Sequence, residues 1–316
     1  MRNHMIRSGL VLAAAPLVLA GLSACSTNAG GDGGGGDSTK MGVTVSNSTN
    51  PFFVKETDTA KSTGESMGFE VLSQEAQEDV STQSNQIDQF VTSRVDFIVI
   101  DPVDSDGVGP AVKRAVAAGI PVVGIDSQTA NADVSVTTDN VQAGTVSCTS
   151  LVEQLKGKGK VAILDGTPIS SVQDRVKGCM EVLEGQPGIE VVAKQRGDNS
   201  RDKALPIATD ILTAHPDIDA FFAINDPSAA GVELAAKQKG AKIIITSVDG
   251  AQAAIDSITG GGMITATAAQ DPAALAKRGV ELGADLAKGK KPEKDLIELP
   301  TELIDASNAA DYKPWG

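Results

Sequence analysis

Short apolar runs alternate with amphipathic segments along most of the chain, and this alternation predicts an α/β protein. The clearest unit spans residues 95–126, where β-branched runs at 97–100 and 122–125 flank a segment with valines at helical spacing. Such runs are typical of strands buried on both faces of a parallel sheet. Each run ends in an aspartate, Asp101 or Asp126, and open α/β sheets bind ligands at the carboxyl ends of their strands. The alternative is that both aspartates only cap the next helix or turn.

The same pattern recurs in a second block of strands and helices. Strands are expected at 220–224 and 242–246. Asn225 and Asp226 follow the first, and Asp249 comes after Val248 beyond the second. Polar strand ends in two similar halves favour a ligand site over capping alone. We therefore expect two similar lobes, each a parallel sheet with helices on both faces.

The remaining periodicity predicts further elements in both lobes. Strands are expected at 41–45, 69–72, 160–164, 189–193 and 263–267, and helices at 80–92, 106–118, 140–155, 171–183, 201–214 and 271–288. Residues 134–137 are interpreted as a crossover segment into the second lobe.

A phenylalanine pair opens the first helix. Asn50 followed by Pro51 is typical of a helix start, so Phe52 and Phe53 fall in the first turn. Aromatic residues make up only 3% of the chain, which makes such a pair at a strand's carboxyl end informative. One ring is expected in the core, and the other is available to stack on the apolar face of a ligand.

The N-terminal segment predicts export. Arg2 and Arg7 precede an apolar stretch at 9–20 that is too short to span a bilayer comfortably, since spanning takes about 20 residues. A basic start, a short apolar run and small residues describe a secretory signal over residues 1–24. The Leu-Ser-Ala-Cys sequence that ends at Cys25 resembles the lipobox of bacterial lipoproteins, which implies a lipid on that cysteine.

Composition narrows the setting further. Residues 25–39 are rich in glycine and small polar residues, and they predict a flexible tether. The formal net charge of −14 and the lack of a basic run with interleaved aromatics exclude nucleic-acid binding. We expect an exported protein held to the outer face of a membrane, or in the periplasm, by its lipid.

Two further cysteines, Cys148 and Cys179, fall in predicted helices of the second block. In an oxidising compartment they could form a disulfide. Two separate buried thiols are the alternative, and the sequence leaves both open.

Catalytic and metal-binding signatures are lacking. The histidines are His4, in the signal, and His215, at a helix end. The sequence has no Gly-x-Ser-x-Gly, His-Glu-x-x-His, Cys-x-x-Cys, phosphate-loop or Gly-x-Gly-x-x-Gly motif. Asp104 to Gly107 lacks the ligand alternation of a calcium loop and is interpreted as a turn. We expect no enzyme activity, no metal and no cofactor.

Eight segments carry a family pattern by their order and spacing. They are Asn50-Pro51-Phe52-Phe53, Asp101-Pro102-Val103-Asp104-Ser105-Asp106, Gly124-Ile125-Asp126, Thr138-Asp139-Asn140, Leu212-Thr213-Ala214-His215-Pro216-Asp217, Asn225-Asp226, Val248-Asp249-Gly250 and Ala268-Ala269-Gln270. In these segments the chain resembles the ribose-binding-protein-like periplasmic solute-binding proteins, over about residues 41–290. The resemblance implies a ligand closed between two lobes and delivered to the permease subunits of an ABC importer.

The resemblance also implies lobe boundaries and a pocket. The N-terminal lobe would comprise 40–137 plus 270–300, and the C-terminal lobe 138–269 plus 301–316, with three hinge crossings. The pocket residues carried over by position are Asn50, Phe52, Phe53, Asp101, Asp126, Ser127, Gln173, Asn199, Asn225, Asp249 and Gln270.

Four pocket positions depart from the ribose pattern. Ser127 and Gln173 stand where the family has arginines, Asp101 replaces an asparagine, and Asn199 replaces an aromatic residue. The change moves the balance from donors toward acceptors, which favours a ligand rich in hydroxyl groups and free of a ring oxygen. We therefore expect a small neutral polyol or a sugar other than ribose, with a pentitol or tetritol first; Arg175 nearby could restore a ring-oxygen donor.

Two other functions fit the same cleft. A sensor subunit would report its ligand to a membrane receptor, and an enzyme acting on sugars would turn its ligand over. A cytoplasmic repressor of similar fold is excluded by the export signal and the lack of a helix-turn-helix.

Overall fold

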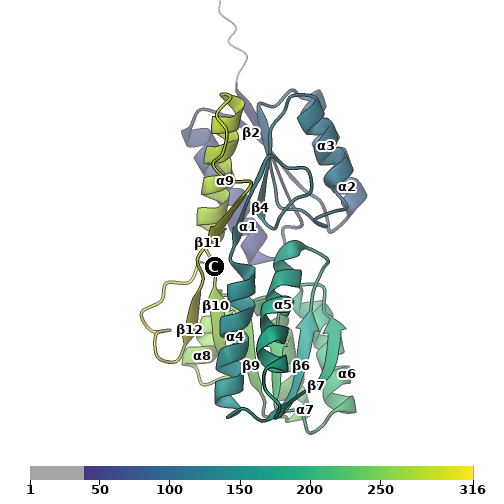
Figure 1. Cartoon of the computed structure of the whole chain (residues 1–316), viewed down its shortest axis with the longest axis vertical. Helices are drawn as coiled ribbons and strands as arrows, with labels where there is room; N and C mark the ends of the chain where they lie inside the picture. The colour runs from purple at the N-terminus through teal and green to yellow at the C-terminus, as the bar shows by residue number, and fades with distance from the viewer. Residues whose placement is uncertain (1–38, 316) are drawn as a thin grey trace, which may run out of the picture. The chain divides into compact units, whose positions relative to one another are not determined.

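The computed structural model describes residues 39–315, which contain two six-stranded sheets (Figure 1). The predicted signal at 1–24, the lipidation site Cys25 and nearly all of the predicted tether lie outside the described residues. The described residues form one compact unit that carries both sheets.

The first sheet is parallel throughout, in the strand order β11-β5-β4-β3-β1-β2. Its strands are β1 (Lys40–Val45), β2 (Glu70–Glu75), β3 (Phe97–Ile100), β4 (Val122–Asp126), β5 (Val134–Thr138) and β11 (Leu296–Leu299). The interpretation of 134–137 as a crossover segment is wrong, because all five residues of β5 are buried within this sheet.

The second sheet repeats this design, in the order β12-β10-β9-β8-β6-β7. Its strands are β6 (Gly159–Asp165), β7 (Ile189–Arg196), β8 (Ala220–Ala223), β9 (Ile244–Asp249), β10 (Ile264–Ala269) and β12 (Glu302–Asp305). Edge strand β12 runs antiparallel to β10, while the other described pairs are parallel.

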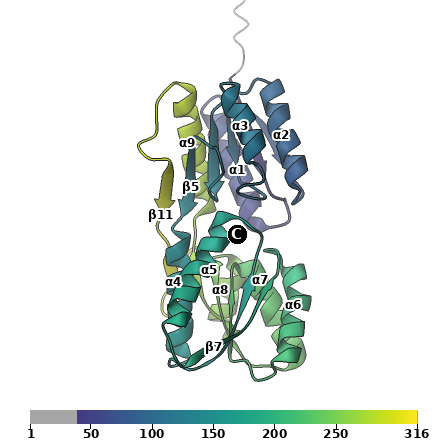
Figure 2. The same ribbon diagram turned by 45° about the vertical axis from the view of Figure 1, so that its right-hand side comes forward.

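Helices cover both faces of each sheet (Figures 1 and 2), which confirms the predicted α/β class. The first sheet carries α1 (Pro51–Ser66) and α9 (Pro272–Ala287) on one face and α2 (Val80–Thr92) and α3 (Gly109–Ala117) on the other. The second carries α4 (Asn140–Gln154) and α5 (Ser170–Glu184) on one face and α6 (Arg201–Ala214), α7 (Asp226–Lys239) and α8 (Gln252–Thr259) on the other.

The chain passes between the two sheets three times. It leaves the first sheet after β5 to form α4, returns after β10 to form α9, and leaves again between β11 and β12. The crossings lie at the carboxyl ends of β5, β10 and β11. The lobe limits assigned from the sequence stay a prediction.

Local sequence fixes the start of α1. The side chain of Asn50 accepts a hydrogen bond from the N–H of Phe52, as expected of an N-cap before Pro51. The buried stripe of α1 continues from the two phenylalanines to Ala60 and Gly64. One member of this stripe, the acid Glu56, is fully buried.

Candidate ligand-binding site

A small cavity lies where the strand ends of the two sheets face each other. Its volume is about 20 Å³, enough for one water-sized molecule. Its lining draws on both sheets and on the second crossing: Asn50, Phe52, Phe53, Asp126, Ile169, Ser171, Val172, Arg175, Asn199, Asn225, Asp249 and Gln270.

Arg175 of α5 lies between one aspartate from each sheet. Its Nη2 is 3.9 Å from Oδ1 of Asp126, and its Nη1 is 3.6 Å from Oδ1 of Asp249. All three side chains are at most 5% exposed. The distances exceed those of direct hydrogen bonds. The guanidinium therefore attracts the two carboxylates electrostatically but does not donate a hydrogen bond to either of them.

The hydrogen bonds of Arg175 instead anchor it to the second sheet. Its Nε donates to Oδ1 of Asn140 at 2.8 Å, and its Nη1 donates to the carbonyl of Ile224 at 3.0 Å. Asn140 in turn donates to the carbonyl of Thr138, at the first crossing. The position of the guanidinium is thus tied to a segment that joins the two sheets.

Close contact between α4 and α5 supports this anchoring. A Cβ on Gly144 would collide with the backbone carbonyl of Arg175, and one on Gly178 would collide with that of Val141. Glycine is therefore required at both positions for the helices to approach so closely. Cys148 and Cys179 join the same two helices through a disulfide bond in the structure, with 5.1 Å between their Cα atoms.

Both pocket aspartates sit on tight turns at strand ends. Asp126 has a φ of 59° and Asp249 a φ of 135°, a region that residues other than glycine rarely adopt. Such strain is retained where the surrounding structure holds a functional geometry. Gln270, at the second crossing, donates from Nε2 to Oδ1 of Asp249 at 2.8 Å and fixes its orientation.

Burial dominates the electrostatics of these acids. It raises the pKa of Asp126, while Arg175 and the hydroxyls of Ser127 and Ser171 lower it by a smaller amount. Burial raises the pKa of Asp249 well above its ordinary value, and Arg175 again acts in the opposite direction. Arg175 is therefore the cation that favours the ionised form of both acids.

Aromatic rings form one apolar wall of the site. Phe52 and Phe53 pack edge to face with ring centroids 5.9 Å apart, and both are buried. Trp315 packs on Phe52 at 5.4 Å and donates from Nε1 to the carbonyl of Asp249 at 2.9 Å. The C-terminal segment thus contacts both halves of the site, a role that its sequence position alone does not indicate.

The structure brings most of the residues carried over by the resemblance to this cavity. Those that line it are Asn50, Phe52, Phe53, Asp126, Asn199, Asn225, Asp249 and Gln270. Ser127 is fully buried beside it, where its hydroxyl lies 2.7 Å from that of Ser171 and 3.2 Å from Asp126. This hydroxyl contact joins the first sheet to α5.

Two of the expected pocket residues lie elsewhere. Gln173 is exposed on α5, because the inward face of that helix carries Ser171 and Arg175 at i and i+4. Asp101 is fully buried behind the cavity and does not line it. Gln173 therefore does not line this cavity, whereas Arg175, two residues further along the helix, does.

Four lining residues were not among the expected pocket residues: Ile169, Ser171, Val172 and Arg175. A helical projection of 170–184 would have found the three that lie on α5, because Arg175 then falls on the same face as the apolar Val172, Val176 and Cys179. An arginine on the buried stripe of a helix needs an acidic partner or a ligand.

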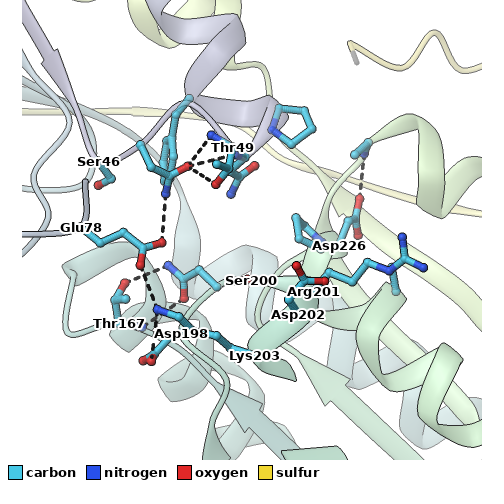
Figure 3. A pocket seen from close by; sticks show the side chains of 18 of the residues that line it. Ser46, Thr49, Glu78, Thr167, Asp198, Ser200, Arg201, Asp202, Lys203 and Asp226 are labelled. Atoms are coloured by element: carbon cyan, nitrogen blue, oxygen red, sulfur yellow. Dashed lines mark hydrogen bonds and ion pairs between the residues drawn. The ribbon is translucent and has the colours of Figure 1, made fainter. Parts of the chain in front are cut away.

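A wider cleft of about 940 Å³ adjoins the cavity, and the two share Asn50, Phe53, Ile169 and Asn199. Figure 3 shows that polar and charged side chains from both sheets surround it. At its edge, Nζ of Lys203 lies 2.9 Å from Oε2 of Glu78, an ion pair between the two halves (Figure 3). The cleft is large enough for a small-molecule ligand, which the inner cavity is not.

Residues 39–315 show neither a metal site nor a membrane-spanning helix. No group of three or more His, Cys, Asp and Glu side chains in that range could hold a metal ion. Within the same range, no helix is both long and apolar enough to cross a membrane.

Comparison with known proteins shows which family the chain resembles. The model of the periplasmic binding protein domain matches residues 41–291. The ribose import binding protein RbsB of Bacillus subtilis is 34% identical over 266 residues, which cover 83% of this chain and 86% of that protein. A xylitol-binding protein of Mycolicibacterium smegmatis is 30% identical over 291 residues, or 90% of this chain and 82% of that protein.

A solved structure shows the same fold. An ABC transporter solute binding protein from Mycobacterium smegmatis, with bound glycerol, superposes with a TM-score of 0.83 and 30% sequence identity. The match covers 87% of this chain and 96% of that one.

Proposed function

This chain belongs to the periplasmic binding protein family, and from that premise we propose that it captures a small neutral sugar or polyol at Arg175, Asp126 and Asp249. Members of this family are binding proteins of transport systems and not enzymes, and they act outside the cytoplasm. The observation that carries the proposal is one guanidinium between two aspartates that come from different sheets.

The chemistry of these groups suits a polyhydroxy ligand. Ionised carboxylates only accept hydrogen bonds and so take the hydrogens of hydroxyl groups, while a guanidinium only donates and so takes their oxygens. Asn50, Asn225 and Gln270 can do both. Hydrogen bonds to charged partners contribute about 1.5–3 kcal/mol each, so a few of them support binding in the micromolar range.

We propose an acyclic pentitol or tetritol as the first candidate. Two observations support it: a relative carries the name xylitol-binding protein, and a structural neighbour contains glycerol. Asn199, rather than an aromatic ring, lines the cavity together with the phenylalanine pair. Arg175 weighs on the other side, because its donors suit a ring oxygen as well as a hydroxyl.

A thermal-shift screen tests the proposal on the mature chain without its lipid. Pentoses, hexoses, pentitols, tetritols and cyclitols form the panel. A ligand present at 100 times its dissociation constant should stabilise the folded protein by about 2.7 kcal/mol. Stabilisation by a member of the panel, lost in R175A, supports the proposal; no shift with any member contradicts it.

The anchoring and delivery steps extend the proposal. We propose that a lipid on Cys25 holds the protein at the membrane, where it delivers its ligand to the permease subunits of an ABC importer. Mass spectrometry of protein extracted from membranes should find a lipidated N-terminal cysteine. In C25A the protein should leave the membrane fraction, and a membrane-bound C25A protein would contradict the anchor.

A further inference from the structure

Glu56 and Asp101 form a buried acid pair that the proposed ligand site does not use. Glu56 lies on the inward stripe of α1, one turn after Phe52, and Asp101 follows β3. Both are 0% exposed, and neither lines the cavity. The two carboxyl groups lie within hydrogen-bonding reach of each other.

The four oxygens of this pair find no donor. Neither carboxyl oxygen of Glu56 or of Asp101 has a hydrogen-bond partner among the described residues. The side-chain amide of Gln83 is already engaged by the backbone beside Asp101: it donates to the carbonyl of Asp101 at 2.8 Å and accepts from the N–H of Val103 at 2.8 Å. Two unpartnered buried carboxylates side by side would be very costly, whereas one proton between them supplies the missing donor.

We propose that Glu56 and Asp101 share one proton and act as a positioning pair for Asp126. The protonation of the pair then sets the negative charge that Asp126 faces in this half of the ligand site. The inference rests on the proposed function only in giving Asp126 a ligand to bind. A neutral acid within the pair leaves Asp126 facing one negative charge instead of two.

The charged groups around the pair are consistent with a retained proton. Asp126 of β4 raises the pKa of both acids, and burial raises them more. Arg175 is a cation that acts on Asp101, and it lowers the pKa of that acid by less than burial raises it. On β2, Glu75 is half-buried, and on α9 Lys277 and Arg278 are exposed.

The sign of the pH effect follows from linkage. An acid whose pKa is higher in the folded than in the unfolded protein makes the folded state bind more protons, so stability falls as pH rises above the ordinary value of 4.5 for glutamate. As the pH rises above 4.5, we expect the melting temperature of the wild type to fall by more than that of E56Q or D101N. E65Q changes an exposed acid on the same helix and should follow the wild type.

Infrared spectroscopy detects the proton itself. At neutral pH, the difference between wild type and the double variant E56Q/D101N should contain one protonated carboxyl and one carboxylate. In the double variant two amides can bond to each other, which protects the fold. A difference spectrum with two carboxylates, or with two protonated acids, would overturn the proposal.

A double-mutant cycle tests the link to Asp126. Because the charge of Asp126 raises the pKa of both partners, E56Q should flatten the pH profile less in a D126N background than in the wild type. Additive effects would show that the pair does not act on Asp126. None of these readouts uses a ligand, so failure here is separable from failure of the proposed function.

Discussion

Two single residues, Asp126 and Asp249, are the proposed acceptors for ligand hydroxyls, one from each sheet. Replacing either by alanine leaves a ligand hydroxyl without its partner in a buried site. We expect a loss of about 2 kcal/mol or more in binding the best ligand of the panel, which is about thirtyfold in affinity. Calorimetry on D126A and D249A measures it, with the exposed acids changed in D58A and D210A as controls. If D126A and D249A both bind within about threefold of wild type, the site is misplaced.

Arg175 should matter for stability as well as for binding. Removing one partner of a buried charge pair costs about 3–5 kcal/mol. In R175A, Asp126 and Asp249 lose the cation that lowers their pKa, so their folded-state pKa rises further. Since a raised pKa of an acid costs stability as pH increases, R175A should lose more stability at neutral than at acidic pH. Urea unfolding of R175A and wild type at both pH values checks this; an equal loss at both would contradict it.

Only some single positions of the site are predictable from the sequence. Strand-end positions such as Asp126 and Asp249 were predictable, because apolar runs of fixed period end there. Positions on α5 were not, because a helix turns about 100° per residue. Two residues along this helix therefore separate Gln173, which is exposed to solvent, from Arg175, which lines the cavity. Asp101 shows a second limit: a polar strand end can face a buried partner, here Glu56, instead of the ligand.

At the scale of elements, the pairing of α4 with α5 holds Arg175 in place. Their disulfide closes a sequence separation of 31 residues, and such a loop is worth about 3–4 kcal/mol in the chain-entropy description. We expect the double variant C148S/C179S to have a free energy of unfolding that is lower by an amount in this range. Urea unfolding of the variant and of the oxidised wild type measures it. Equal stability of the variant and the oxidised wild type would contradict a structural role.

Thiol titration tests the bond in the exported protein. The denatured, unreduced chain without Cys25 should show no free thiol, and reduction should release two. Two free thiols before reduction would mean that Cys148 and Cys179 are separate in the mature protein, the alternative that their sequence positions left open.

Most elements were predictable in kind, and their ends were less so. The helices at 80–92 and 201–214 have the expected bounds, since caps and breakers flank them. β9 was expected from residue 242 but runs Ile244–Asp249. Its pairing with β8 begins at Ile244 and its pairing with β10 ends at Asp249, and no local pattern encodes these partners.

At the scale of the whole body, binding requires the two halves to separate and close. The inner cavity of about 20 Å³ cannot admit a pentitol, while its lining comes from both sheets. Contacts such as Lys203 with Glu78 must therefore open for entry and re-form around the ligand. We expect small-angle scattering to show a smaller radius of gyration at saturating ligand. An unchanged radius would contradict closure.

Calorimetry with ribose, xylitol and threitol on one preparation of the mature, unlipidated chain compares an acyclic polyol with a ring sugar at the proposed site. We predict that xylitol or threitol binds at one site per chain and more tightly than ribose, and that R175A loses this binding. Ribose binding most tightly would contradict the preference for an acyclic polyol, and binding that survives in R175A would contradict the site itself.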